Sequence, residues 1–230
     1  MPDHELKLIK TLEYKRPEVD KGYVDQTLYV NVSDSDIAVK PVEQKTKEVF
    51  IGGKGYDLWL LWNAVEPTTR WNEPQNAVCI ACGPMGGTPS APGSGKSIVT
   101  TLSPLTGAPI DSNVGGYFGP YLKFSGFDAM EIQGKASEDT IIYIDGIEGQ
   151  VQIFSASGLP ENAYELSTCL TEHFAAGKPR SISVVSAGPG AKNTLIGCLN
   201  FTWYDTKRKR ARYKQAGLHS KSKGIHQWQN

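Results

Sequence analysis

Alternation of apolar and polar residues is the main structural signal of this chain. In residues 26–42, QTLYVNVSDSDIAVKPV, the alternation continues on both sides of Ser-Asp-Ser-Asp and predicts a β-hairpin with one buried face. Residues 140–154, TIIYIDGIEGQVQIF, predict a second hairpin with a glycine-containing turn. The apolar run in residues 76–84, NAVCIACGP, is too short for a helix and indicates a buried strand.

Two segments have helical spacing instead. Residues 49–65, VFIGGKGYDLWLLWNAV, predict a short apolar strand, a glycine turn and then a helix. Residues 160–177 predict a helix with Pro160 in its first turn, and Gly177 ends it. Its apolar face comprises Ala163, Leu166, Leu170 and Phe174. Residues 181–190, SISVVSAGPG, follow as a further strand, so the predicted class is α+β with β dominant.

The two ends of the chain lack a clear apolar period. The first 21 residues carry mixed charge and predict a loose or helical extension. The segment from residue 205 to the end contains the basic run TKRKRARYK and predicts an exposed tail. This run could neutralise nucleic-acid phosphates, but a solvated segment is the preferred interpretation, so nucleic acid is not the expected partner.

Composition narrows the environment of the protein. Lys and Arg number 24 and Asp and Glu also number 24, so no global field favours an acidic partner. The start of the chain has no apolar signal core, and no run approaches the roughly 20 apolar residues of a membrane span. Four scattered cysteines do not form a secreted disulfide framework. We therefore expect a cytoplasmic protein without a membrane partner.

The most conspicuous candidate for ligand binding is GSGKS at residues 93–97. A nucleotide-binding P-loop needs a first glycine, where this chain has Ser90, and a helix directly after the motif. Residues 97–107, SIVTTLSPLTG, are rich in β-branched residues and contain Pro104, so they predict a strand. Nucleotide binding therefore remains a weaker alternative, and so does an ordinary surface turn.

The cysteines give little support to a metal site. Cys79 and Cys82 form a CxxC pair, which offers two ligands where zinc or iron–sulfur sites need about four. Both lie in the predicted buried strand, on opposite faces, so a core role is preferred. Cys169 and Cys198 are also expected in the core.

A longer series of motifs bears on which phosphate-containing ligand the GSGKS segment could bind. Residues 83–136 contain GPMGGT, GSGKS, SPLTG, SNVGGYFGPYLKFSGFD and IQGKA in one order, with IGGKGYDLWLL upstream and SAGPGAKN downstream. In this order they resemble the N-terminal domain of the aldehyde ferredoxin oxidoreductase family of tungsten enzymes. The resemblance covers residues 22–217, which leaves residues 1–21 as an extension and 218–230 as a divergent polar tail.

The resemblance implies a sheet-rich domain that seats a tungsten or molybdenum bis-pterin cofactor, whose two phosphates are bridged by magnesium. Lys96 matches an arginine that contacts phosphate, and Asn113 matches a position whose backbone holds magnesium and pterin. Lys214 matches a second phosphate-binding arginine, and Gln215 matches a residue whose carbonyl binds magnesium. The implied cofactor-binding positions are Lys96, Asn113, Gly115, Gly116, Lys214 and Gln215.

The sequence departs from the family pattern after Gly217, where LHSKSKGIHQWQN replaces a glycine-rich continuation. By resemblance, the complete enzymes oxidise aldehydes to carboxylic acids and pass electrons through a [4Fe–4S] cluster to ferredoxin. The cluster ligands belong to two further domains, so these 230 residues alone are expected to be inactive. A homo-oligomer is compatible with the family. A non-catalytic remnant or binding module is the other alternative.

Overall fold

The central element is a six-stranded mixed sheet. The computed structural model describes residues 6–90, 92–195 and 197–218. The strands of this sheet are β2 (Gln26–Asn31), β3 (Asp36–Pro41), β4 (Val78–Ala81), β5 (Ser97–Leu102), β6 (Pro109–Val114) and β7 (Ala129–Gln133). Their spatial order is β3-β2-β7-β4-β5-β6. Strands β2 and β7 run parallel, and all other neighbours in the sheet are antiparallel.

Two antiparallel three-stranded sheets pack on one face of the large sheet. One has the order β1-β9-β8 and the other β10-β11-β12. Their strands are β1 (Leu8–Glu13), β8 (Thr140–Asp145), β9 (Gln150–Ser155), β10 (Val185–Ser186), β11 (Gly197–Asp205) and β12 (Arg210–Leu218). Two buried clusters join them to the large sheet: Val30 and Ile132 meet Val151 and Ile153, and Ile80 and Val99 meet Leu199 and Phe201.

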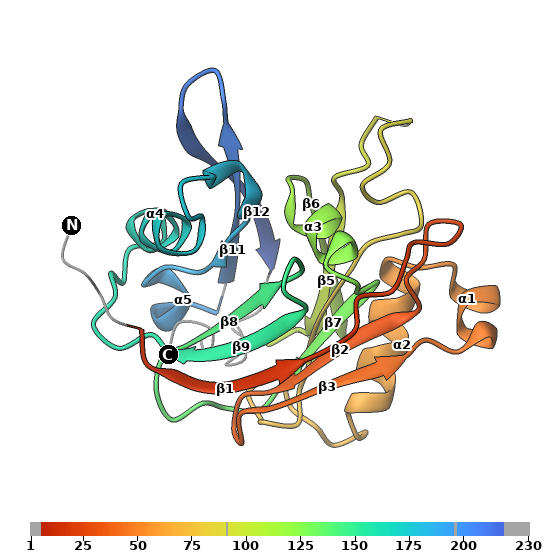
Figure 1. Ribbon diagram of the computed structural model, residues 1–230. Helices are drawn as coiled ribbons and strands as arrows, with labels where there is room; N and C mark the ends of the chain where they lie inside the picture. Colours follow the sequence, from red (N-terminus) through yellow and green to blue (C-terminus); the bar gives the residue numbers. More distant parts are fainter. Residues whose placement is uncertain (1–5, 91, 196, 219–230) are drawn as a thin grey trace.

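Helices cover the outer faces of these layers (Figure 1). Helices α1 (Gln44–Phe50) and α2 (Lys54–Ala64) lie beside the large sheet, where Leu61 packs on Cys79. Helix α4 (Ala163–Phe174) covers the small sheets, and α3 (Phe118–Phe124) connects β6 to β7. The remaining short elements are η1 (Pro179–Ser181) and α5 (Gly190–Asn193). The sheet-rich α+β class predicted from sequence is confirmed.

Local sequence explains most of these elements. Both predicted hairpins form, as β2–β3 and β8–β9, and the apolar run at 76–84 contains β4, whose residues are all buried. Asn162 caps the N-terminus of α4, and its side-chain oxygen accepts a hydrogen bond of 2.9 Å from the Tyr164 backbone. Pro160 therefore precedes the helix and does not lie in its first turn.

Three further expectations are corrected. Residues 8–13 form β1 and not a loose or helical extension, because β9 offers a free edge for pairing. The strand expected near residue 50 is the end of α1. Residues 205–218 belong to the β11–β12 hairpin and not to an exposed tail, because backbone pairing with the buried strand β11 does not require apolar side chains in its partner.

The cysteine positions differ among themselves. Cys79 and Cys82 are buried, as expected for core residues. Burial raises the pKa of the Cys79 thiol, and it raises that of Cys82 to about 11, so both sulfurs stay protonated at neutral pH. Cys169 is only half-buried on α4, which corrects its core assignment. The backbone of Cys198 lies in β11, and its side chain lies outside the described residues.

Candidate cofactor-binding site

The GSGKS motif leads into a strand. Residues Ser97–Leu102 form β5, as the β-branched residues predicted. A P-loop directs the amides of a helix N-terminus at the phosphates, and this geometry does not occur here. The loop therefore presents the Lys96 side chain and open backbone, without a helix dipole behind it.

Strand pairing brings the motif beside the second glycine-rich segment. Ser97 pairs with Val114, and Ile98 pairs with Asn113, so Lys96 lies at the same sheet end as Gly115. We call residues 93–97 and 113–116 the glycine corner. Residues of both segments are far apart in sequence, and the β5–β6 ladder alone places them together.

Gly95 allows the close approach of these two segments. A Cβ added to Gly95 would lie 2.4 Å from the carbonyl oxygen of Gly116. Real Cβ atoms do not approach backbone this closely, so the corner requires glycine at position 95. Gly119 in α3 also packs closely against the corner, because a Cβ there would lie 3.2 Å from the carbonyl oxygen of Lys96.

The outer side of the corner is open. A Cβ added to Gly115 would have no neighbour within 4 Å, and one added to Gly116 would have only the Thr202 carbonyl, at 3.9 Å. The side chains of Lys96 and Asn113 are exposed. A cation and bare backbone thus share one open surface, which is the arrangement that phosphate-bearing ligands require.

Strand β12 brings the remaining predicted positions to the same region. The backbones of Lys214 and Gln215 pair with Phe201 and Asn200, and β12 lies beside β6. The side chains of Lys214 and Gln215 lie outside the described residues. Thr202, which pairs with Tyr213 next to Lys214, also lies beside Gly116, so the backbones of all six positions named from the sequence lie in one region.

An aromatic contact that the sequence did not reveal borders the corner. The rings of Tyr117 and Trp203 lie 6.2 Å apart, edge to face. Tyr117 directly follows Gly116, so its position could have been inferred from the motif. The position of Trp203 could not have been inferred, because it depends on the β11–β12 pairing, and the basic run between these strands was interpreted as part of an exposed tail.

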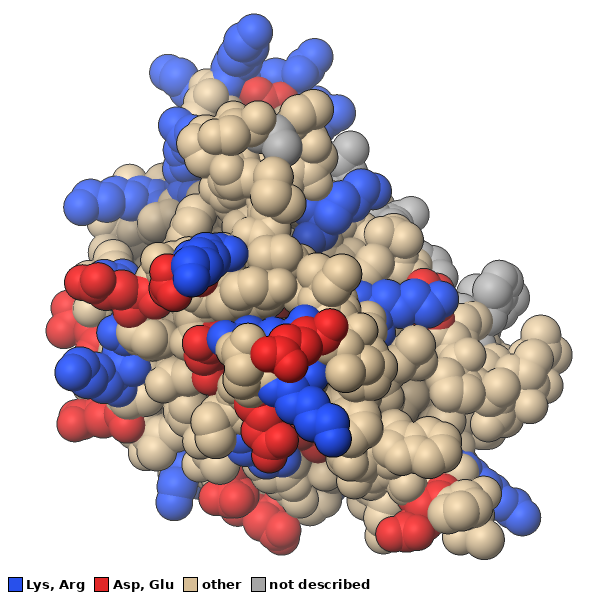
Figure 2. All heavy atoms as spheres, turned by 90° about the vertical axis from the view of Figure 1, so that its right-hand side faces the viewer, with Lys and Arg blue, Asp and Glu red and all other residues tan. Residues whose placement is uncertain are grey.

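The turn of the β11–β12 hairpin is strongly basic. Lys207, Arg208, Lys209 and Arg210 are exposed there, and Figure 2 shows Lys and Arg side chains gathered at this end of the molecule. Hydrogen bonds from the Arg208 backbone and side chain lower the pKa of Asp205, which begins the turn.

Within the described ranges, no three His, Cys, Asp or Glu side chains gather as a metal site. No helix in the same part of the chain has the length and apolar character needed to cross a membrane.

Comparison with known proteins identifies the family. A sequence model of the aldehyde ferredoxin oxidoreductase N-terminal domain matches residues 27–226. The chain belongs to the aldehyde ferredoxin oxidoreductase family. It is 35% identical over 167 residues to the tungsten-containing aldehyde ferredoxin oxidoreductase of Pyrococcus furiosus, which is 72% of this chain and 27% of that relative.

Other family members show the same partial coverage. The tungsten-containing enzyme of Thermococcus kodakarensis is 32% identical over 73% of this chain and 27% of its own length. The glyceraldehyde-3-phosphate:ferredoxin oxidoreductase of Pyrococcus furiosus is 32% identical over 55% of the chain and 21% of its own length. The chain thus spans about a quarter of these oxidoreductases.

A solved structure shares the fold. The active-site complex BamBC of benzoyl coenzyme A reductase superposes with a TM-score of 0.75 at 24% identity. The match covers 90% of this chain and 30% of that one.

Proposed function

We propose that residues 22–217 seat one side of a tungsten or molybdenum bis-pterin cofactor in an enzyme that oxidises aldehydes to carboxylic acids. The observation that carries this proposal is the glycine corner, where an exposed cation adjoins backbone that no side chain covers. Family membership supports it, because the matched relatives are named as tungsten-containing aldehyde ferredoxin oxidoreductases.

In this proposal, each of the six positions has a definite role toward the cofactor. Lys96 would neutralise a pterin phosphate as a point charge, without the two-pronged contact of an arginine. The carbonyl oxygens of Asn113 and Gln215 would serve magnesium, which prefers oxygen ligands. Gly115 and Gly116 would let the pterin approach the backbone. For Lys214, whose side chain lies outside the described residues, the contact with the second phosphate rests on the family resemblance alone.

In this proposal the cofactor, this domain and the rest of the enzyme have different roles. The metal–pterin group, when bound, supplies the two-electron redox chemistry, while the protein binds, orients and shields it. This domain provides one binding face, and we expect the [4Fe–4S] cluster and the aldehyde pocket in the part of the relatives beyond the match. Ferredoxin would then accept the electrons of the complete enzyme.

A chimera tests the proposal. The 230-residue chain is joined to the part of the Pyrococcus furiosus relative that follows its matched region, and both the chimera and the chain alone are produced in a host that makes the cofactor. We expect bound metal and viologen-linked aldehyde oxidation in the chimera only, because a buried cofactor needs contacts from several sides. Near-stoichiometric tungsten or molybdenum on the chain alone would contradict the proposal.

Substitutions in the chimera test the role of Lys96. Lys96→Ala should lower cofactor occupancy about tenfold, the worth of one hydrogen bond to a charged group. Lys96→Arg should retain occupancy, and Lys45→Ala, an exposed lysine on α1, serves as the control. Equal cofactor occupancy in all three variants would contradict a phosphate-binding role of Lys96.

A nucleotide titration tests the alternative function. Calorimetry with Mg-ATP should show no binding to the chain, whereas micromolar binding that is lost in Lys96→Ala would favour a nucleotide site.

A further inference from the structure

The turn of the β11–β12 hairpin concentrates positive charge in a chain whose formal net charge is zero. Its four successive basic side chains are all exposed: Lys207, Arg208, Lys209 and Arg210. Arg212 follows on β12, and we call residues 206–212 the basic turn. A positive patch of this density attracts a negatively charged partner over about one Debye length, roughly 8 Å at physiological salt.

Continuous strand pairing fixes the backbone on both sides of the basic turn. All nine residues of β11 pair with β12 in one register. The Asp205 side chain then accepts hydrogen bonds from the backbone amides of Lys207 and Arg208, at 3.0 and 3.1 Å. Figure 1 shows that the hairpin projects from the body of the molecule. The charges are therefore displayed from a paired, projecting backbone and not from a loose tail.

Most of the charge in the basic turn has no internal counter-charge. The guanidinium of Arg208 lies 3.1 Å from the Asp205 carboxylate. Among the described residues, no carboxylate lies within ion-pair distance of Lys207, Lys209 or Arg210. Adjacent like charges repel each other, and a negatively charged partner relieves this repulsion when it binds. The basic turn is thus suited to an anionic surface.

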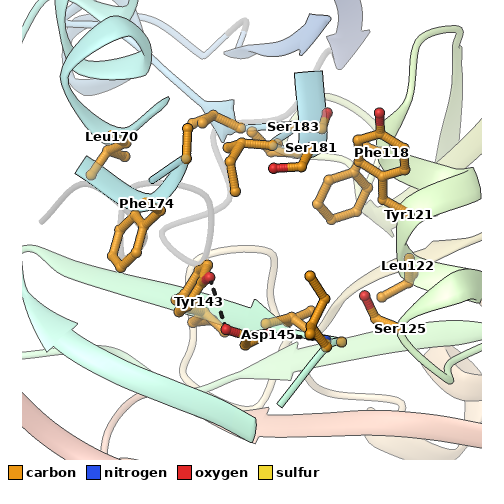
Figure 3. Close-up of a pocket in the computed structure, with 18 of the residues that line it drawn as sticks. Phe118, Tyr121, Leu122, Ser125, Tyr143, Asp145, Leu170, Phe174, Ser181 and Ser183 are labelled. Carbon is orange, nitrogen blue, oxygen red and sulfur yellow. Dashed lines mark hydrogen bonds between the residues drawn. The ribbon is translucent and has the colours of Figure 1, made fainter. Parts of the chain in front are cut away.

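A neighbouring segment adds two further cations. The short helix η1 packs beside β11, and the side chains of Lys178 and Arg180 in this segment are exposed. The Tyr121 hydroxyl of α3 donates a hydrogen bond of 2.5 Å to the Arg180 carbonyl. Figure 3 shows Tyr121 and Ser181 of this segment among the residues that line one pocket. Both cations are therefore held beside the strand that leads into the basic turn.

The basic turn lies next to the proposed cofactor face. The carbonyl oxygen of Thr202 lies 3.9 Å from a Cβ placed on Gly116. The rings of Trp203 and Tyr117, 6.2 Å apart, join the hairpin to the glycine corner. Asp205, where the turn begins, follows Thr202 by three residues, which is about 10 Å along an extended strand. A protein bound at the basic turn would lie beside the glycine corner.

The aromatic residues of the hairpin argue against nucleic acid as the partner. Single-stranded nucleic acids bind where a basic groove carries bare aromatic faces on which bases stack. Trp203 instead packs edge to face on Tyr117, and Tyr213 packs edge to face on Tyr164 at 4.5 Å. The turn itself, TKRKRAR, contains no aromatic residue. An acidic protein surface fits this arrangement better, because it requires charge alone.

We propose that the basic turn is the docking surface for an acidic electron-acceptor protein. The inference rests on the proposed function, in which electrons leave a cofactor seated at the glycine corner. Complexes between electron-transfer proteins have small interfaces, and opposite charges steer their encounter. A projecting group of exposed cations beside the cofactor face provides this steering without a large apolar interface.

A binding experiment uses the 230-residue chain, with an acidic ferredoxin as the probe. The test variant combines three charge reversals in the basic turn: Lys207→Glu, Lys209→Glu and Arg210→Glu. The control variant combines three reversals at exposed lysines elsewhere on the surface: Lys10→Glu, Lys45→Glu and Lys135→Glu. Both variants change the net charge equally. We expect the dissociation constant to rise about tenfold or more in the test variant and to stay nearly unchanged in the control.

The salt dependence of the wild-type chain gives a second measurement that needs no variant. Affinity for ferredoxin should fall as the ionic strength rises, because salt screens the exposed charges. Absence of binding, equal weakening in both variants, or an affinity independent of salt would each overturn the proposal. Tighter binding of a single-stranded RNA than of ferredoxin would also overturn it and would assign the surface to nucleic acid.

The chimera described above separates this inference from the proposed function. The three reversals in the basic turn should raise the KM for ferredoxin about tenfold and leave viologen-linked oxidation unchanged, because a small dye needs no docking surface. An inactive chimera with the unaltered turn would contradict the proposed function. An active chimera whose KM for ferredoxin is insensitive to the reversals would contradict the docking surface.

Discussion

Each half of the described chain contains a hairpin, a long helix and a three-stranded antiparallel run: β2–β3, α2 and β4-β5-β6 in the first, and β8–β9, α4 and β10-β11-β12 in the second. The first set lies in one sheet, and the second set lies in two. Strand β7 completes the β2-to-β4 connection and is buried on both faces. The second half retains a cavity between β8 and β10 at the corresponding place. In the first half, α3 and β7 connect β6 back to the middle of the large sheet, whereas among the described residues of the second half no strand joins β8 to β10.

The first half also shows how the closing strand is fixed. The ammonium of Lys123 in α3 lies 3.4 Å from a carboxylate oxygen of Asp128, directly before β7, and both side chains are 1% exposed. Lys123 also donates to the carbonyl of Gly83 at 2.9 Å, and Asp128 accepts from the Asp25 backbone at 2.8 Å. These contacts tie the α3–β7 connection to the loops around it.

Breaking this pair should have the largest effect on stability. Asp128→Ala leaves the Lys123 ammonium buried without its counter-charge, and we expect the free energy of unfolding to fall by about 3–5 kcal/mol. The matched control is Asp111→Ala, which removes the surface partner of Lys54 and should cost at most about 1 kcal/mol. Urea denaturation measures both. Similar losses in the two variants would mean that the Lys123–Asp128 pair does not fix the closing strand.

The sequence predicted elements in both halves. Alternation identified the hairpins β2–β3 and β8–β9, the apolar run identified β4, whose residues are all buried, and the β-branched residues identified β5. It missed β1, whose residues are almost all exposed, since an edge strand on the outside needs no apolar period. It also missed β12, because a basic turn resembles a solvated tail until its partner strand is known.

The candidate site was likewise predictable from the sequence only where its features are local. The glycines at 115 and 116 were identifiable from the motif, because only glycine leaves backbone open to a ligand. Their proximity to Lys96 depends on the β5–β6 register, and their proximity to Lys214 depends on β12 lying beside β6. Neither relation is local in sequence, so only the fold or a family resemblance could supply it.

Equivalent core substitutions in the two halves should differ in the unfolding free energy that they cost. Ile132→Ala, in β7, creates a new cavity in a fully buried cluster and should cost about 3 kcal/mol. Ile144→Ala, in β8, enlarges a cavity that already exists beside a half-buried side chain, so we expect about 1 kcal/mol. Thermal or urea unfolding of both variants checks the difference. Equal costs would show that the β8–β10 space is packed in solution as tightly as β7.

Helices α2 and α4 differ in the polar group that each one buries against its half of the domain. On α2, Asp57 is fully buried and accepts a hydrogen bond of 3.3 Å from the Thr100 hydroxyl. On α4, the neutral hydroxyl of Ser167 lies 2.9 Å from that of Ser186. Burial raises the pKa of Asp57 well above its usual range, and the hydrogen bonds from Thr100 and the Ala81 backbone offset only part of this.

The raised carboxyl pKa of Asp57 in the folded state determines the direction in which stability changes with pH. Folding favours protonated Asp57, so its contribution to stability is fully present below the unfolded carboxyl pKa, near 3.9, and declines as the pH rises toward the folded value. Asp57→Asn, which cannot ionise, should therefore match the wild-type chain near pH 4 and exceed its stability by about 1–2 kcal/mol at neutral or alkaline pH. Ser167→Ala on α4 should show no such pH dependence. Urea denaturation of the three chains from pH 4 to pH 9 measures the effect, and a constant difference between Asp57→Asn and wild type across this range would contradict a titrating Asp57 beneath α2.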